Sequence, residues 1–465
     1  MRMARSVNEY FRCPESFIQL AQMGSLSADS GYFRFGSETI CYGTSSSGFR
    51  SRQVTGPLHD VLADVSTDRD GTVRLALDPT EIVENLRHER YELSGGKGVS
   101  RLAESGLSQT VYYWLRPLLP VSIRKHLQRR RLSDWQTLAF PRWPVDRTVE
   151  EIHERLLALS LKAKGLQRVP FVWFWPDGAK SCAIMTHDVE ALAGRDFCSQ
   201  LMDLDSSAGI RSSFEIVPEV RYPVPGTLLD EIRARGFEVN IHDLSHDGRL
   251  FSNRAEFLRR IQRIHQYARD YGALGFRSGV LNRNQAWYGD LEFSYDMSIP
   301  NVGHLDPQRG GCCSLMPFFI GKVLELPVTM IQDYSLFHIL NDYSLDLWTR
   351  QLRAITENHG LASFIIHPDY VIEGRARAIY QALLEHLATV REERKMWIAL
   401  PREVDRWWRE RSQMKVVTDG GRWRILGEGR ERARVAFARI AGDRLVFTVE
   451  DDNEATECSS LAPTA

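Results

Sequence analysis

The chain of 465 residues is long enough for two or three domains, and its composition, 43% hydrophobic and 26% charged, is that of an ordinary globular protein. A formal net charge of −1 excludes a strongly basic protein that would bind nucleic acid through its overall charge. The seven cysteines show no zinc-ribbon or disulfide spacing, which favours free thiols in a reducing compartment. With a polar amino-terminal segment and no run of about 18 apolar residues, the sequence predicts a cytoplasmic protein.

Residues 1–145 combine short β-type segments with polar turns, and we expect an accessory α+β region there, without a catalytic motif. The region includes the stretch 112–131, in which aromatic and leucine residues lead into a basic run. Aromatic side chains beside basic ones suit peripheral contact with a membrane. A helix with a solvated basic face explains the same pattern and is the simpler interpretation.

Between 146 and 412, short runs rich in Val, Ile and Phe alternate with helical stretches of roughly 12 to 20 residues. Residues 254–271 and 376–390 place apolar residues at helical spacing, with charges on the other face. The alternation predicts an α/β domain with a parallel sheet or barrel. The predicted strands are Ser181–Thr186, Ser212–Val217, Phe237–Ile241, Leu274–Phe276, Val323–Leu326, Ala362–His367 and Trp397–Leu400.

Residues 413–465 form the third predicted region. Short strands at 414–418, 422–426, 433–440 and 444–449 are separated by glycine-containing turns, which indicates a small β meander. The acidic, serine-containing end after residue 450 has the composition of a disordered tail.

Four polar clusters directly follow predicted strands, where βα folds carry their functional residues. They are Thr186–Glu190, His242–Asp247, Phe276–Gly279 and Ile365–Asp369. In the second cluster, His242 and His246 are four residues apart, and two imidazoles on one helical turn can reach the same metal ion. Two histidines at this spacing also occur by chance on solvated helices, so the pair predicts a metal site only together with the other clusters.

Each of the other clusters has a structural alternative. Asp188 and Glu190 flank Val189, so in an extended segment both point the same way, and one can bind a metal while the other takes a proton from water. Carboxylates are also favoured at a helix N-terminus. Arg277 fits either a surface cation or a two-pronged hydrogen bond that holds a carboxylate. His367, at a strand end, fits a core histidine or a general acid equally well.

The order of the clusters resembles the polysaccharide deacetylases, also called NodB-homology proteins or carbohydrate esterase family 4, over roughly residues 170–400. That family has an Asp-containing motif, an H-[ST]-x-x-H-type motif, an Arg-x-Pro motif and a late strand ending in Leu-His. The matching segments here are Thr186–Glu190, His242–His246, Arg277–Gly279 and Ile365–His367, with further similarity at 175–178 and 295–298. The resemblance implies a distorted (β/α) barrel, which the N-terminal α+β region and the small C-terminal β domain predicted above would flank.

By position, the resemblance implies Asp188 as general base and Glu190, with both histidines of the second motif, as metal ligands. Arg277 would brace Asp188, and His367 would protonate the leaving amine. The implied cofactor is a divalent metal ion, with Zn²⁺ as the first choice. The opposite assignment, with Asp188 as the ligand, stays open. The late aspartate of the family corresponds to Asp296 or Asp333.

The resulting hypothesis is a metal-dependent hydrolase that removes N-acetyl groups from the sugars of a polysaccharide or glycan precursor. Two alternatives remain. One is an amidohydrolase acting on a small cyclic amide or ureide, which a deep closed pocket would favour. The other is a catalytically silent carbohydrate-binding barrel, against which the retained acid and base residues argue.

Overall fold

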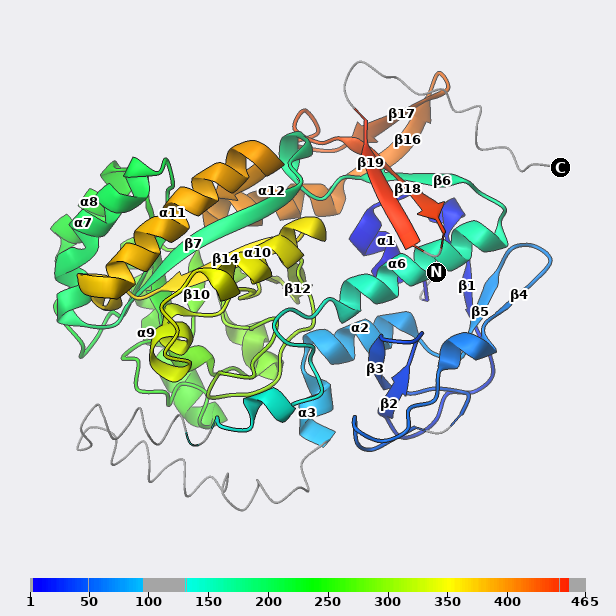
Figure 1. Ribbon diagram of the computed structural model, residues 1–465, viewed down its shortest axis with the longest axis horizontal. Helices are drawn as coiled ribbons and strands as arrows, with labels where there is room; N and C mark the ends of the chain where they lie inside the picture. The colour runs from blue at the N-terminus through cyan, green and yellow to red at the C-terminus, as the bar shows by residue number, and fades with distance from the viewer. Residues whose placement is uncertain (1–2, 49, 95–129, 131, 443, 451–465) are drawn as a thin grey trace. The chain divides into compact units, whose positions relative to one another are not determined.

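The computed structural model describes residues 3–48, 50–94, 130, 132–442 and 444–450 (Figure 1). The chain forms two compact units: unit 1 comprises 1–95, 146–179 and 406–465, and unit 2 comprises 96–145 and 180–405. This division differs from the three consecutive domains predicted at 1–145, 146–412 and 413–465, because residues 146–179 pack with the two terminal parts of the chain.

The described helices include none that is both long enough and apolar enough to cross a membrane. The stretch 112–131, predicted as a possible membrane contact, lies outside the described residues apart from Arg130, as does the tail predicted after 450. The cysteines in the described part of the chain are buried free thiols, as predicted.

Unit 2 contains a nine-stranded sheet in the order β12-β13-β11-β10-β9-β8-β7-β14, with β15 also paired to β7. The strands are parallel except β12, which is antiparallel to β13. All seven predicted strands are present with small shifts at their ends. The bounds are β7 (Ser181–Val189), β8 (Ser213–Ile216), β9 (Glu238–His242), β10 (Gly275–Arg277), β11 (Tyr295–Asp296), β12 (Phe318–Ile320), β13 (Val323–Glu325), β14 (Leu361–Ile366) and β15 (Met396–Ala399).

The sheet curls into a distorted barrel, which confirms the predicted fold class. Beyond β13, the chain reaches β14 at the other end of the sheet, where the N–H of Met330 donates to the carbonyl of Ser363 at 3.2 Å. The hydroxyl of Thr329 donates to the carbonyl of Leu361 (2.6 Å) and accepts the N–H of Ser363 (2.9 Å). A short irregular segment therefore bridges the gap that regular strand pairing leaves open.

The interior of this barrel is polar. Glu215 in β8 and Asn240 in β9 are fully buried, and both alternate with apolar residues that belong to the core beneath the helices. Because side chains alternate along a strand, the polar set faces the barrel axis. Gly275 in β10 leaves room there for the ring of Tyr295, since a Cβ at this glycine would lie 2.1 Å from the ring.

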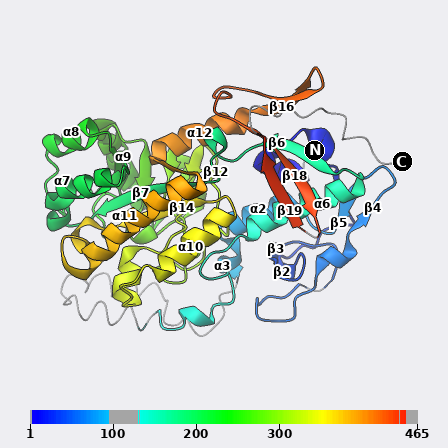
Figure 2. The ribbon, with the colours of Figure 1, turned by 45° about the horizontal axis from the view of Figure 1, so that its top comes forward.

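Helices cover the outer face of the sheet (Figures 1 and 2). The predicted helix at 254–271 is α9, whose N-cap Asn253 accepts the N–H of Glu256 and whose last turn ends at Gly272 with φ 59°. Its apolar residues at helical spacing are buried, each contributing roughly 1.5–3 kcal/mol. The helices that lie wholly in unit 2 are α7 (Leu192–Ser207), α8 (Gly226–Ala234), α9 (Arg254–Tyr271), α10 (Asp346–Glu357) and α11 (Gly374–Arg394), and α12 (Pro401–Gln413) continues from unit 2 into unit 1.

Unit 1 contains small sheets around the helix α6 (Thr148–Ala163). Its other helices are α1 (Arg5–Phe11), α2 (Pro79–Arg87) and α3 (Arg90–Ser94). Its strands are β1 (Leu20–Gln22), β2 (Gly31–Arg34), β3 (Ile40–Gly43), β4 (Ser66–Thr67), β5 (Val73–Leu75), β6 (Arg168–Val172), β16 (Lys415–Asp419), β17 (Arg422–Leu426), β18 (Val435–Ala441) and β19 (Arg444–Val449).

The four strands predicted after residue 412 exist, but they do not form the single meander that was expected. β16 pairs with β17 as a separate hairpin, whereas β18 lies between β19 and β6. β6 comes from residues 168–172, far away in the sequence, and a pattern of turns between consecutive strands cannot reveal such a non-local partner.

Candidate metal centre and active site

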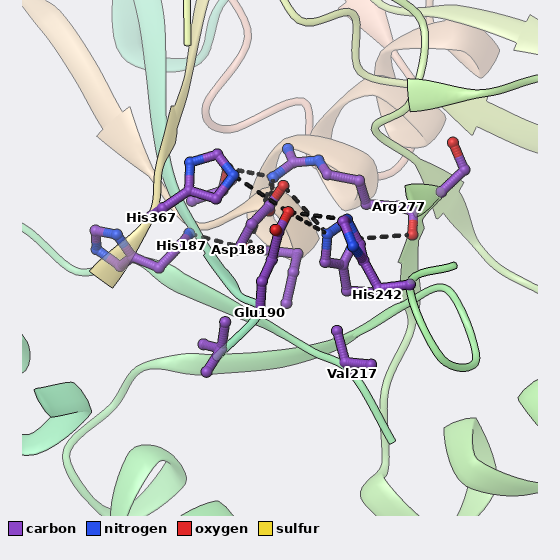
Figure 3. A network of polar contacts seen from close by, with 12 residues as sticks. His187, Asp188, Glu190, Val217, His242, Arg277 and His367 are labelled. Carbon is purple, nitrogen blue, oxygen red and sulfur yellow. Dashed lines mark hydrogen bonds and ion pairs between the residues drawn. The ribbon is translucent and has the colours of Figure 1, made fainter. Parts of the chain in front are cut away.

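Two carboxylates stand where β7 ends. Asp188 is the second-last residue of this fully buried strand, and Glu190 follows the strand directly. Both side chains point toward His242: its Nε2 is 3.5 Å from Asp188 Oδ2 and 3.4 Å from Glu190 Oε1 (Figure 3). The N-cap position of α7 belongs to Ala191, so Glu190 faces the histidines rather than acting as the helix cap.

The two histidines of the second motif do not lie on a helical turn, which corrects the geometry expected from their spacing. His242 is the last residue of β9, and His246 lies in the irregular loop that follows. Two residues of this loop, Asp243 (φ 57°) and His246 (φ 52°), adopt the left-handed conformation. These two residues fold the loop back, so that the centroids of the two imidazole rings lie 4.7 Å apart. Such strained backbone is typical of ligand sites.

Three imidazole nitrogens converge on one carboxylate oxygen. Glu190 Oε1 is 2.8 Å from His246 Nε2, 3.3 Å from His367 Nε2 and 3.4 Å from His242 Nε2. Despite its short distance to Glu190, the buried Nε2 of His246 makes no hydrogen bond. The Nε2 of His242 makes one long hydrogen bond, of 3.4 Å, to the same oxygen. Buried polar atoms normally have good partners, so three nitrogens gathered around one oxygen, one of them without a hydrogen bond, indicate a position for a cation.

Two sets of ligand atoms are close enough to share one ion. The first is Glu190 with His242 and His246, and the second is Glu190 with Asp188 and His367. The donor chemistry fits a divalent ion such as zinc, which takes two histidines and one carboxylate and leaves positions open. The ring of His242 is also held suitably, because its Nδ1 lies 3.2 Å from the carbonyl of Arg277; an Nδ1–H that donates there leaves Nε2 as the ligand atom.

The carboxylates are held in their ionised forms. Burial alone would raise the pKa of Glu190, but the neighbouring His246 and His367 hold it well below the usual value. Burial likewise opposes ionisation of Asp188, whose pKa is nevertheless lowered by Arg277, His242 and His367. Both groups are therefore available as anions, one to bind a metal and the other to accept a proton.

Arg277, fully buried, contacts Asp188 by one nitrogen only. Its Nη1 donates to Asp188 Oδ1 (2.6 Å) and lies 2.7 Å from Thr186 Oγ1, while Nε donates to the carbonyl of Met297 (3.0 Å). The two-pronged hydrogen bond expected from the sequence is therefore not formed. The contact leaves Asp188 Oδ2 facing His242, so one oxygen of this carboxylate is fixed and the other faces the cluster.

His367 is held by Asp333, which identifies this residue and not Asp296 as the aspartate beside the late histidine. Asp333 Oδ1 lies 2.6 Å from His367 Nδ1, and Oδ2 accepts the backbone N–H of His367 at 2.7 Å. Asp296 instead accepts hydrogen bonds from Tyr288 and Ser298. Burial opposes a charged imidazole, but Asp333 and Glu190 raise the pKa of His367 well above its usual value.

Glu215 is a buried residue near the site that sequence reasoning missed. Its Oε2 accepts the N–H of His187 at 3.0 Å and lies 3.9 Å from Arg277 Nη1, so Arg277 stands between two carboxylates. The signal was a charged residue between two apolar ones, Phe214 and Ile216, in the strand predicted at 212–217. A second unpredicted residue, Arg221, reaches His246 Nδ1 at 3.4 Å.

No family model and no curated protein matches the sequence. Its structural neighbours are polysaccharide deacetylases and related enzymes, similar over half of the chain at low identity, and the predicted resemblance is confirmed at that level. A candidate polysaccharide deacetylase from Mycobacterium smegmatis has 17% identity and a TM-score of 0.40, covering 51% of this chain and 93% of its own. PuuE allantoinase has 12% sequence identity and a TM-score of 0.39, and the match covers 50% of this chain and 92% of the allantoinase. Peptidoglycan deacetylase PdaC from Bacillus subtilis has 11% sequence identity and a TM-score of 0.33, and the match covers 50% of this chain and 93% of PdaC.

Proposed function

We propose that this chain is a metal-dependent hydrolase that removes N-acetyl groups from sugars of a polysaccharide or glycan precursor. The observation that carries the proposal is the cluster around Glu190 Oε1, where a candidate metal-binding triad lies between a braced carboxylate, Asp188, and a braced imidazole, His367. Binding a sugar would not require a base and an acid held on either side of a metal position.

In this proposal, Glu190, His242 and His246 hold a divalent ion, with zinc as the first choice for two imidazoles and a carboxylate. When bound, such an ion polarises the acyl carbonyl and lowers the pKa of water. Glu190 is assigned as ligand rather than Asp188 because it contributes to both candidate triads, whereas Asp188 already has one oxygen engaged by Arg277.

The remaining residues of the site divide the proton transfers between them. Asp188, oriented by Arg277, takes the proton of the attacking water through its free oxygen. His367, whose Nδ1 is held by Asp333, carries its transferable proton on Nε2 and gives it to the nitrogen of the leaving amine. The depressed pKa of Asp188 and the elevated pKa of His367 suit a base that starts ionised and an acid that starts protonated.

A hydrolase acting on a small cyclic amide or ureide is the second candidate. Its support is the low exposure of the site, since the side chains of His242, His246 and His367 are only 1%, 2% and 5% exposed. Such a site admits a small group, which is either the acetyl group of a larger sugar or a small substrate as a whole.

The decisive experiment is to purify the protein, measure its bound metal, and assay acetate release from N-acetylglucosamine oligomers, with allantoin hydrolysis as the parallel assay. Acetate release that a chelator abolishes and added zinc restores is the expected result. Hydrolysis of allantoin alone would select the second candidate. Acetate release that survives complete metal removal would overturn the mechanism, and bound metal without either activity would indicate a binding barrel.

A further inference from the structure

The loop after β8 is fixed to the end of β7 and to the loop that follows β9. The N–H of Val217 donates to the hydroxyl of Tyr222 (3.1 Å), and that hydroxyl contacts the carbonyl of Val189, the last residue of β7. The N–H of Glu219 donates at 3.0 Å to the carbonyl of Leu244, in the loop between the two histidines. The position of the loop is therefore determined from both sides, beside the candidate metal ligands.

Between these anchors, the loop presents two exposed residues, Val220 and Arg221. Val220 is 86% exposed and has a φ of 73°, in the left-handed region that β-branched residues avoid. Strain of this kind persists where the surroundings determine the backbone, and such positions gather at ligand-binding sites. No buried contact of the Val220 side chain explains its placement, since this side chain lies in solvent.

Arg221 contacts His246. The Nδ1 atoms of His242 and His367 face oxygen acceptors, whereas the Nδ1 of His246 faces this guanidinium. The Nη2 of Arg221 lies 3.4 Å from His246 Nδ1. A guanidinium only donates, so Nδ1 must accept, and a neutral imidazole with an accepting Nδ1 carries its proton on Nε2. His242 has the opposite arrangement, because its Nδ1 faces a carbonyl.

The Arg221 contact and a metal ion on His246 Nε2 are therefore mutually exclusive, since a neutral ring has only one accepting nitrogen. Once Nε2 binds an ion, the proton sits on Nδ1 and two donors face each other, so the arginine loses this partner. Within the described part of the chain, no carboxylate forms an ion pair with Arg221; the nearby Glu219 pairs with Arg263. In the metal-loaded protein, an exposed guanidinium without a carboxylate thus stands at the edge of the site.

We propose that Arg221 binds an anionic group, a phosphate or a carboxylate, carried by the N-acetylated substrate close to the scissile amide, and that Val220 packs against the same sugar. The inference rests on the proposed function and narrows its substrate class from neutral oligomers to anionic N-acetyl sugars. Guanidinium recognises both anions through paired N–H groups. The carboxylates of the site itself would repel such a substrate, and Arg221 offsets that repulsion.

The test measures binding of reaction products, which needs no turnover. Glucosamine, glucosamine 6-phosphate and muramic acid are titrated calorimetrically into the zinc-loaded protein, so that the two anions are compared with the neutral sugar. We expect at least one anionic sugar to bind about tenfold more tightly than glucosamine, the size of a charge-assisted hydrogen bond. In Arg221→Gln this preference falls to within about twofold, and Arg221→Lys retains part of it. Arg353→Gln, in the exposed ion pair of α10, is the matched control and keeps the preference.

Each outcome separates the inference from the function it rests on. The anionic sugar that binds more tightly shows whether the substrate carries a phosphate or a carboxylate. If the wild-type protein binds neither anionic sugar more tightly than glucosamine, the inference is overturned. A preference that survives in Arg221→Gln overturns it as well. If glucosamine itself does not bind, the proposed sugar substrate fails, whatever Arg221 does.

A second readout concerns the metal alone. Zinc affinity, measured by competition with a chelating dye, is expected to rise threefold to tenfold in Arg221→Gln, because the wild-type protein loses a hydrogen bond on loading. Unchanged affinity would contradict the release of Arg221.

Discussion

The barrel of unit 2 holds two buried polar groups of residues that differ in how their atoms are satisfied. The polar column, defined as Glu215, Ser213, Asn240, Tyr295 and Glu238, is a continuous chain of hydrogen bonds inside the barrel. Its Ser213 donates to Glu215 (2.6 Å), and Asn240 donates to Ser213 (2.8 Å) and accepts from Tyr295 (3.0 Å). Each donor along it meets an acceptor, which is the condition under which buried polar groups stabilise a core.

The cluster around Glu190 has the opposite character. Three imidazole nitrogens point at one oxygen, and the Nε2 of His246 makes no hydrogen bond although it is buried. Both regions belong to the same barrel and are largely buried, although the Glu190 side chain is 20% exposed. In these two regions, satisfaction of hydrogen bonds, more than burial, separates the structural polar residues from the candidate functional ones. Changes in the two regions should therefore affect different measurable quantities.

The largest effect is expected from His242→Ala. Loss of one ligand should reduce bound zinc from one per chain toward none and lower kcat/KM for acetate release on the order of a thousandfold, since the ion supplies several kcal/mol to the transition state. His265→Gln is the matched control, because His265 is a 4% exposed histidine of α9 that accepts the N–H of Glu292 away from the site. Equal loss of zinc in both variants would contradict the assignment.

Asp333→Asn should separate the acid from the metal. An amide in place of Asp333 cannot accept both the Nδ1–H and the backbone N–H of His367, so the imidazole loses its orientation and the carboxylate that keeps it protonated. We expect kcat to fall on the order of a hundredfold, as for loss of a general acid. Bound zinc, measured by elemental analysis, should stay at one per chain, and loss of the metal would show that Asp333 supports the ligands instead.

Features of the fold that depend on residues close together in the sequence could be predicted, and features that depend on residues far apart in the sequence could not. Seven strands of the barrel and the helices α9 and α11 were predicted because runs rich in Val, Ile and Phe and the helical spacing of apolar residues are local patterns, whereas the short strands β11 and β12 were not predicted. The alternation of polar and apolar residues in 213–216 and 238–242 would ordinarily indicate a sheet with one solvated face. Only closure of the barrel turns that polar face inward, and closure depends on Thr329 and Met330, which carry no strand pattern of their own.

The site residues were brought together as the motifs suggested, but the reason was partly different. His242 and His246 converge because two residues of the loop, Asp243 and His246, adopt the left-handed backbone conformation. The spacing of the two histidines cannot distinguish such a loop from a helical turn. Asp333 was one of two candidate aspartates, and only its distance to His367 separates it from Asp296. The partner of Arg277 was predicted, whereas Glu215 was not, because a carboxylate inside a strand has no motif.

Tyr295→Phe alters the polar column and should lower the stability of the protein without affecting metal binding. Removal of the hydroxyl deletes its hydrogen bonds with Asn240 and Glu238, while Asn240 still accepts the N–H of Gly275 and Glu238 still accepts hydrogen bonds from Asn240 and the N–H of Arg402. We expect the free energy of unfolding to fall by about 0.5–1.5 kcal/mol, the net contribution of a buried hydrogen bond whose acceptors keep other donors. Chemical denaturation measures the loss, and elemental analysis should still find one zinc per chain. A variant of unaltered stability that has lost its metal would reverse the assignment of the two regions.

The prediction for Glu238→Gln concerns the pH dependence of stability. Burial raises the pKa of Glu238 to about 7, although hydrogen bonds from Tyr295, the Arg402 N–H and Asn240 oppose the shift. Between its unfolded value of about 4.5 and 7, the folded chain holds this proton more tightly than the unfolded chain does. The contribution to stability is therefore complete below pH 4.5 and is lost as the pH rises through 7, by on the order of 3 kcal/mol at most. Glutamine does not titrate, so the free energy of unfolding of Glu238→Gln should decline less between pH 5 and 8. Parallel pH profiles for the two proteins would show that Glu238 is ionised in the barrel, and the column would then hold a buried charge rather than a satisfied network.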